Sequence, residues 1–255
     1  MFSTLAVHFL PALTSPEELA ASDVVMIDVL RASTTIAHAL SAGAISVVPC
    51  GEVDEARQTA ARMPAGTFVL GGERGGLPIE GFHLGNSPTE YTPASVGGKT
   101  VVFTTTNGTA ALLKCRSAAQ VLIGSFANLS AVPKLIDGRR PVHLLCAGTR
   151  GRITREDVLL AGALTERLLE STVDRASMND QARIALDVWQ AAVPPGRGRT
   201  RDLTKHLSAA LRECQGGRNL LGIGLERDIE TAAEVDRFDL VPALNVSTWR
   251  ITAPG

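Results

Sequence analysis

Three segments of the chain follow one order: a short apolar run, a polar loop and a run of helix-forming residues. The apolar runs cover residues 24–27, 101–103 and 142–146. Strands that alternate with helices in this way are typical of a mostly parallel or mixed sheet with helices on its faces. We therefore predict a three-layer α/β/α fold, in which the loops that leave the strands gather at one edge and bind a ligand there.

The first two segments match each other without a gap when the chain is shifted by 76 residues. The shift places Asp28 on Thr104, and it places Arg31 on Asn107. An internal duplication of a βα unit would produce this match, but so would coincidence, because βα units resemble one another in any α/β protein. In both cases we expect the two loops to meet at a shared edge of the sheet.

The loop of the second segment, residues 104–109, reads Thr-Thr-Thr-Asn-Gly-Thr between a predicted strand and a predicted helix. Its hydroxyl groups, the free backbone N–H groups of the helix start and the helix dipole all favour a bound anion. The alternative is a hairpin turn at Asn107-Gly108. A hairpin needs a second strand, and residues 110–114 are poor strand sequence. The context therefore favours the anion site.

Composition excludes several classes of protein. The chain has 255 residues, of which 45% are hydrophobic and 20% charged, and its formal net charge is −1. Binding of nucleic acid needs a basic face, which this balance does not offer. No segment approaches the roughly 20 apolar residues of a membrane span, and the first residues do not resemble a signal peptide. Four cysteines without a C-x-x-C pair fit a reducing cytoplasm and no structural zinc.

The pattern of the chain changes near residue 140. Residues 1–140 alternate short apolar runs with loops rich in glycine and proline, whereas residues 141–255 contain longer amphipathic stretches. We predict two α/β halves that pack closely, the second more helical than the first. Residues 194–199, rich in proline, glycine and arginine, are predicted to be an exposed linker.

Two further loops carry groups suited to ligand binding. Glu73 and Arg74 stand between glycines, which let the backbone approach a ligand closely. The alternative is a surface turn with a weak ion pair. Asn86 and Ser87 follow in a second loop of small and polar residues, and the alternative there is a plain connection.

Acidic residues open the helix of the third segment. Thr154 and Asp157 have the spacing of a capping box, so Glu156 and Asp157 have an ordinary role at a helix start. If the loops share an edge, however, Asp157 lies near Asp28 and Glu73. Carboxylates beside hydroxyl and amide donors suit Mg²⁺, which takes oxygen ligands and brings phosphate with it.

Cys146 offers a different chemistry. Cys146 and Arg152 have the spacing of phosphatases in which a thiolate attacks phosphorus and an arginine binds the phosphate oxygens. The next residue is Ile153, where such a loop would carry a hydroxyl. The cysteine mechanism is therefore the weaker alternative.

Six motifs in this order resemble the 2-phosphosulfolactate phosphatase family, and the likeness extends more loosely to the region of Asp228. The motifs are IDVLRASTT (27–35), GGER (71–74), LGNSPTEY (84–91), TTTNGT (104–109), CAGT (146–149) and EDVL (156–159). The resemblance implies a Mg²⁺-dependent acid phosphatase that converts 2-phospho-3-sulfolactate to 3-sulfolactate and phosphate. In methanogens this step belongs to coenzyme M biosynthesis.

Together with the loops above, the resemblance implies the following site. The predicted catalytic residues are Asp28, Arg31, Glu73 and Arg74, and the predicted metal ligands are Asp28, Glu73 and Asp157. The predicted substrate-binding residues are Ser33, Asn86, Ser87, Thr105, Thr106, Asn107, Gly108 and Thr109. The alternative from another class is a protein that binds a small phosphorylated or sulfonated acid without turnover. We expect a small anionic substrate as the partner, with no nucleic acid and no membrane, and homo-oligomerisation is left open.

Overall fold

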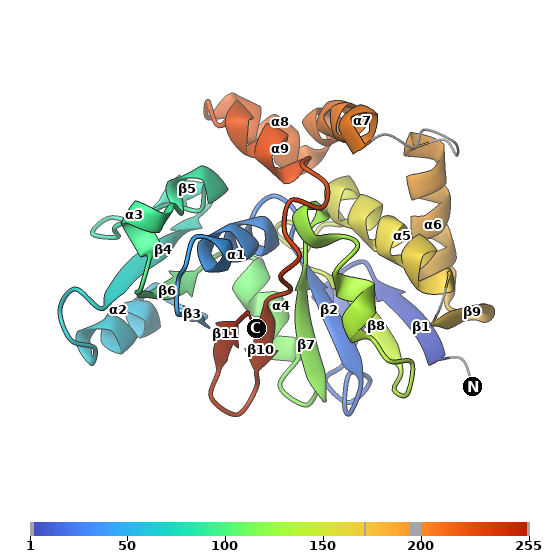
Figure 1. Cartoon of the computed structure of the whole chain (residues 1–255), viewed down its shortest axis with the longest axis horizontal. Coiled ribbons are helices and arrows are strands. Elements are labelled where there is room, and N and C mark those ends of the chain that lie inside the picture. The colour runs from blue at the N-terminus through green and yellow to red at the C-terminus, as the bar shows by residue number, and fades with distance from the viewer. Residues whose placement is uncertain (1–2, 171, 194–199, 254–255) are drawn as a thin grey trace.

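The computed structural model describes residues 3–170, 172–193 and 200–253. In this part of the chain the strands form one mixed sheet of eleven strands, and helices pack on both of its faces (Figure 1). The predicted three-layer α/β/α class is therefore confirmed. The linker predicted at residues 194–199 lies outside the described residues.

The strands are β1 (Ser3–His8), β2 (Asp23–Ile27), β3 (Ser46–Pro49), β4 (Phe68–Arg74), β5 (Leu77–Pro78), β6 (Thr100–Thr104), β7 (Gln120–Gly124), β8 (Val142–Cys146), β9 (Val173–Met178), β10 (Ala243–Asn245) and β11 (Arg250–Thr252). The α-helices are α1 (Ala32–Ser41), α2 (Val53–Ala61), α3 (Pro93–Val96), α4 (Gly108–Lys114), α5 (Arg155–Leu169), α6 (Asp180–Ala192), α7 (Thr200–Glu213), α8 (Gln215–Gly222) and α9 (Glu226–Ala232). The long helices α5, α6 and α7 all follow residue 140, as the amphipathic stretches predict.

The sheet consists of two groups of parallel strands that a hairpin joins. Its order is β5-β4-β6-β3-β11-β10-β7-β2-β8-β1-β9. The group β4–β6–β3 is parallel within itself, as is the group from β7 to β9. Three successive antiparallel pairings, β3 with β11, β11 with β10 and β10 with β7, separate the two groups. The two groups therefore run in opposite directions.

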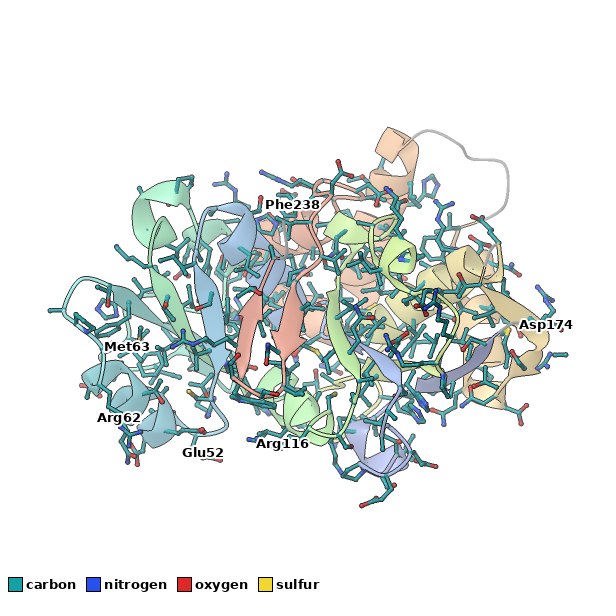
Figure 2. All side chains as sticks on the ribbon, turned by 60° about the horizontal axis from the view of Figure 1, so that its bottom comes forward. Glu52, Arg62, Met63, Arg116, Asp174 and Phe238 are labelled. Carbon is teal, nitrogen blue, oxygen red and sulfur yellow. The ribbon has the colours of Figure 1, made fainter. Side chains whose placement is uncertain are left out.

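The hairpin β10–β11 is held in this central place by Trp249. The indole Nε1 of Trp249 donates a hydrogen bond of 2.8 Å to the carbonyl of Pro49, at the end of β3. The guanidinium of Arg116, which follows α4, lies 4.0 Å from the centre of the Trp249 ring, near the end of the hairpin in Figure 2. The hydrogen bond joins the hairpin to the end of β3, and the cation–π contact joins it to the segment that follows α4.

Alternate residues of β2 point to opposite faces of the sheet, as in any strand. Val24 and Met26 are buried in a cluster with Ile36 of α1 and Leu112 of α4. Val25 and Ile27 belong to the cluster on the other face, which α5 and α6 cover. Beside β4 and β6, α2 covers a smaller third cluster. These clusters form the core between the three layers.

The two segments that match in sequence also match in arrangement. One is β2–α1–β3 and the other is β6–α4–β7, and they exchange strands: β3 pairs with β6, and β7 pairs with β2. Ala32 and Gly108, which the 76-residue shift equates, lie in contact, because a Cβ built on Gly108 would be 2.6 Å from that of Ala32. The two loops thus meet across the N-termini of two helices, and not at one edge of a parallel sheet, since β2 and β6 run in opposite directions.

Strands from both sides of residue 140 are interleaved. The strand β8 of the second predicted half lies between β1 and β2 of the first. Both predicted halves thus contribute strands to one sheet, and the division near residue 140 stays a prediction. In Figure 1, α7, α8 and α9 lie together above the sheet. No helix within the described ranges is long and apolar enough to span a bilayer.

Candidate active site

A cavity of about 420 Å³ opens where the loops after β2, β4, β6 and β8 meet α8. Six residues predicted from the sequence line it: Asp28, Arg31, Glu73, Asn86, Thr106 and Asn107. The other predicted residues are not part of its lining: Ser33, Arg74, Ser87, Thr105, Gly108, Thr109 and Asp157. The structure therefore brings the six predicted residues, from four motifs, to one cavity, where Thr149 of a fifth motif also lies. The predicted residues outside the lining belong to the surrounding loops and helices.

Asp28 follows β2 and is buried at the floor of the cavity. Its Oδ1 atom accepts a hydrogen bond of 3.3 Å from the backbone N–H of Ala32. Burial raises the pKa of Asp28 to about 7, and the negative charges of Glu73 and Glu156 act in the same direction. A Cβ built on Gly108 would lie 2.8 Å from Oδ2 of Asp28, so the absence of a side chain at Gly108 allows the two loops to meet.

Glu73 connects the loop after β4 with the loop after β6. Its Oε1 atom accepts a hydrogen bond of 2.7 Å from the backbone N–H of Thr106. Its Oε2 atom accepts hydrogen bonds from the N–H of Gly76 and the hydroxyl of Thr106, at 2.6 Å and 3.2 Å. The carboxylate thus holds two loops together while it lines the cavity.

Arg31 is held from two sides. Its Nη1 atom lies 2.7 Å from Oδ2 of Asp228 in a buried ion pair, and its Nη2 donates to the carbonyl of Gly76 at 3.3 Å. The other oxygen of Asp228 accepts a hydrogen bond of 2.5 Å from the hydroxyl of Ser87. Asp228 was not among the predicted site residues, because nothing near it in the sequence indicates a partner just before α1.

Arg74 is directed elsewhere. Its guanidinium donates to the carbonyl of Gly51 and to the hydroxyl of Thr104, at 2.9 Å and 2.8 Å. It also donates to the carbonyl of Glu73. These contacts join the ends of β4 and β6 to the loop after β3. Arg74 therefore supports the loops, and its catalytic role stays a prediction.

Several predicted hydroxyl groups are used inside their own loops. The hydroxyl of Ser33 donates to the carbonyl of Asp28 at 2.8 Å. Thr109 donates its hydroxyl to the carbonyl of Thr105 at 2.7 Å, and its backbone N–H approaches the hydroxyl of Thr105 at 3.3 Å. All three side chains are buried. Their hydrogen bonds set the shape of the loops, so a ligand would meet Thr106 and Asn107 first.

Asp157 lies behind Asp28, at the start of α5. Its Oδ1 atom accepts from the N–H of Val29, and its Oδ2 atom accepts from the N–H of Gly148, both at 2.9 Å. The hydroxyl of Thr154 donates to Oδ2 as well, at 3.1 Å. Burial raises its pKa well above the usual value, and the neighbouring Asp28 charge adds to this effect. Both oxygens therefore anchor the loops after β2 and β8.

Cys146 does not meet the requirements of a nucleophile. It ends β8, is fully buried, and does not line the cavity. Burial raises the pKa of its thiol well above the usual value, and the charges of Asp157 and Glu156 raise it further. A reactive cysteine needs an accessible site that lowers its pKa. The structure therefore argues against the cysteine mechanism.

Two arginines that the sequence did not single out also line the cavity, Arg150 from the loop after β8 and Arg218 from α8. Both are exposed. The backbone N–H of Arg150 donates to Oδ1 of Asn107 at 2.9 Å, which joins the third loop to the second. A Cβ built on Gly75 would lie 3.5 Å from Nη2 of Arg150. Positive charge is thus present at the rim, above the carboxylates of the floor.

The lining offers oxygen ligands of the kind that Mg²⁺ takes. Among the described residues no three His, Cys, Asp or Glu side chains form a ready metal-binding group. Asp28 and Glu73 nevertheless face one cavity, and Oδ1 of Asn86 is buried there without a hydrogen-bond partner in the described structure. Mg²⁺ commonly uses only one or two carboxylates and completes its shell with water and substrate phosphate. The donor set therefore fits this ion.

Comparison with known proteins gives one consistent answer. The family model described as 2-phosphosulpholactate phosphatase matches residues 8–246. A protein of Caldanaerobacter subterraneus subsp. tengcongensis named probable 2-phosphosulfolactate phosphatase is 40% identical over 231 residues, which cover 89% of each chain. A protein of the same name from Thermotoga maritima is 40% identical over 220 residues, 86% of this chain and 88% of its own. One from Prochlorococcus marinus is 38% identical over 240 residues, 92% and 94% of the two chains.

Proposed function

The chain belongs to the 2-phosphosulfolactate phosphatase family, and we propose that it hydrolyses 2-phospho-3-sulfolactate to 3-sulfolactate and inorganic phosphate. The observation that carries this proposal is the meeting of Asp28, Arg31 and Glu73 in one cavity of about 420 Å³. That volume suits a small ligand. A three-carbon acid with phosphate, sulfonate and carboxylate groups needs many hydrogen-bond donors and little space.

Arg31 is the group best placed to bind the phosphate. A guanidinium has five N–H donors, and the contacts with Asp228 and Gly76 fix its orientation while they leave further donors for a ligand. Thr106 and Asn107 line the same cavity and add a hydroxyl and an amide. During phosphoryl transfer the negative charge spreads over the equatorial oxygens, and donors held in position stabilise it without reorganisation.

We also propose Mg²⁺ as the cofactor, held by Asp28 and Glu73. The ion would neutralise phosphate charge in the transition state. A cation between Asp28 and Glu73 would remove the repulsion that contributes to the raised pKa of Asp28. Asp157 was predicted as a third ligand. Because its oxygens accept hydrogen bonds from the backbone of two loops, we now propose that it positions Asp28.

The test is release of phosphate from an aryl phosphate and from 2-phospho-3-sulfolactate. Each substrate is measured with Mg²⁺, with excess EDTA, and with Mg²⁺ restored after EDTA. We expect turnover of both substrates, its loss in EDTA and its recovery with Mg²⁺. Full activity in excess chelator would contradict the role of the metal.

Binding of 3-sulfolactate without release of phosphate from either ester would instead support a non-catalytic binding protein. Equal turnover of 2-phospho-3-sulfolactate and unrelated phosphates would support a phosphatase activity but contradict 2-phospho-3-sulfolactate as its specific substrate. The cytoplasmic location and the link to coenzyme M biosynthesis stay predictions of the sequence.

A further inference from the structure

The charges that line the cavity are unevenly paired. Arg31 is matched by Asp228 in a buried ion pair. Within the described parts of the chain, the ion pairs include neither Arg150 nor Arg218. The cavity thus has, besides the arginine proposed to bind phosphate, two cations that form no ion pair with a carboxylate of the described residues.

Arg150 occupies a conformation that arginine rarely adopts. Thr149 and Arg152 exchange two backbone hydrogen bonds, of 2.9 Å and 3.0 Å, so that Arg150 and Gly151 form the tip of a two-residue turn. Both tip residues have positive φ, 52° and 72°. Such turns favour asparagine, aspartate or glycine at these positions. Strained positions of this kind are concentrated at functional sites, and this one lies at the cavity.

Arg218 reaches the same cavity from α8. Its guanidinium donates to the carbonyl of Glu213 and to the side-chain oxygen of Gln215, the latter at 3.2 Å. Both acceptors are neutral, so they orient the guanidinium without cancelling its charge. Its charge also acts at longer range on the buried Glu156, and guanidinium N–H donors remain for an anionic ligand.

We propose that Arg150 and Arg218 bind a second acid group of the substrate, one of its sulfonate and carboxylate groups, and thereby select phosphate esters that carry such a group. This inference rests on the proposed phosphatase function and adds the selection of the substrate. Guanidinium groups bind planar or tetrahedral oxyanions through paired hydrogen bonds. The phosphate lies at Arg31, and the far end of a short acid lies at the two rim arginines.

The experiment compares kcat/KM for 2-phospho-3-sulfolactate and for an aryl phosphate that carries no second acid. The variants are Arg150→Gln, Arg218→Gln and the double variant, and the control is Arg152→Gln, an exposed arginine of the same turn that does not line the cavity. The measured ratio is kcat/KM for 2-phospho-3-sulfolactate divided by kcat/KM for the aryl phosphate. We expect each single variant to lower this ratio by about tenfold, mainly because KM for 2-phospho-3-sulfolactate rises. Lysine at either position should restore part of the ratio.

A ratio that stays at the wild-type value in the double variant would overturn the inference, as would an equal change in Arg152→Gln. Calorimetric titration with 3-sulfolactate and with inorganic phosphate gives a second measurement that does not need turnover. We expect the rim variants to weaken binding of 3-sulfolactate more than binding of phosphate. If no phosphate ester is hydrolysed, the proposed function fails, and the titration still decides whether these arginines recognise the second acid group.

Discussion

Asp228 follows Arg31 by 197 positions in the chain, yet its Oδ2 atom lies 2.7 Å from Nη1 of Arg31 in a buried ion pair. This contact connects α9 to the start of α1. It explains how the C-terminal part of the chain takes part in a site whose motifs lie earlier in the sequence. A buried pair of this kind is sensitive to loss of one partner, because the other charge is then left without compensation.

We therefore expect Asp228→Asn to weaken both the fold and the site. The unpaired Arg31 should lower the free energy of unfolding by about 3 kcal/mol. Because Arg31 would also lose its fixed orientation, KM should rise. Denaturant unfolding and steady-state kinetics on the same protein measure the two effects. The control is Asp239→Asn, an exposed carboxylate of the same C-terminal region, and an Asp228→Asn enzyme indistinguishable from this control would contradict the prediction.

Asp28→Asn should abolish most turnover. Asp28 is the carboxylate at the floor of the cavity, and an amide cannot replace its charge as a ligand to a cation. We expect kcat to fall by several orders of magnitude in a protein that still folds, and circular dichroism checks the fold. Asp54→Asn removes a carboxylate from the exposed surface and serves as the control. Near-wild-type turnover in folded Asp28→Asn protein would contradict the proposed catalytic role of Asp28.

Gly108→Ala tests the meeting of the two loops. The added Cβ would lie 2.6 Å from the Cβ of Ala32 and 2.8 Å from Oδ2 of Asp28, so the loops must move apart. Overpacking of this kind costs about 1–3 kcal/mol. We expect a larger effect on kcat/KM than on stability, because the displacement occurs at Asp28. Ala110→Ser, on the exposed side of the same helix, should change neither quantity appreciably.

His8 and His143 should make stability depend on pH. The rings are stacked on β1 and β8, with Nε2 of His8 2.9 Å from Nδ1 of His143. Burial lowers the pKa of both, that of His143 to about 4. Between about pH 6.5 and pH 4 these two imidazoles then bind more protons in the unfolded chain than in the folded one. Their contribution to stability should be complete above that range and be lost as the pH decreases through it.

Denaturant unfolding at neutral and at acidic pH measures this slope. His143→Gln should reduce the slope but not abolish it, because burial also lowers the pKa of His38 to about 4. An unchanged slope in His143→Gln would show that the pair is not responsible.

Cys146→Ser should retain most of its turnover. The thiol is fully buried, and its raised pKa keeps it protonated at neutral pH. Iodoacetamide should likewise leave the folded enzyme active. A serine variant that folds normally but has lost all turnover would restore the cysteine mechanism and contradict the site described above.

The sequence alone was sufficient to predict the order of several strands and helices and to identify loops that form the site. Apolar runs and helix-forming runs are local patterns, and they correctly indicated β2 with α1, β6 with α4, and β8 with α5. Asp28 and Thr106 could be selected because each stands in a loop directly after a strand, and Glu73 because it stands near the end of a strand, in β4. These features depend on neighbours within a few residues of each other.

Only the tertiary structure decided how those residues are used. Arg74 is directed toward Thr104, and Asp157 is held by two backbone N–H groups. Arg31 is paired with Asp228, and Arg218 reaches the cavity from α8. Most of these contacts join segments that are distant in the sequence. The direction of a side chain depends on which partner the packed sheet brings near it. A local pattern carries no information about that partner, because the partner comes from a distant segment. The hairpin β10–β11 sets β3, β6 and β4 antiparallel to the group from β7 to β9, and this arrangement helps to determine which loops meet.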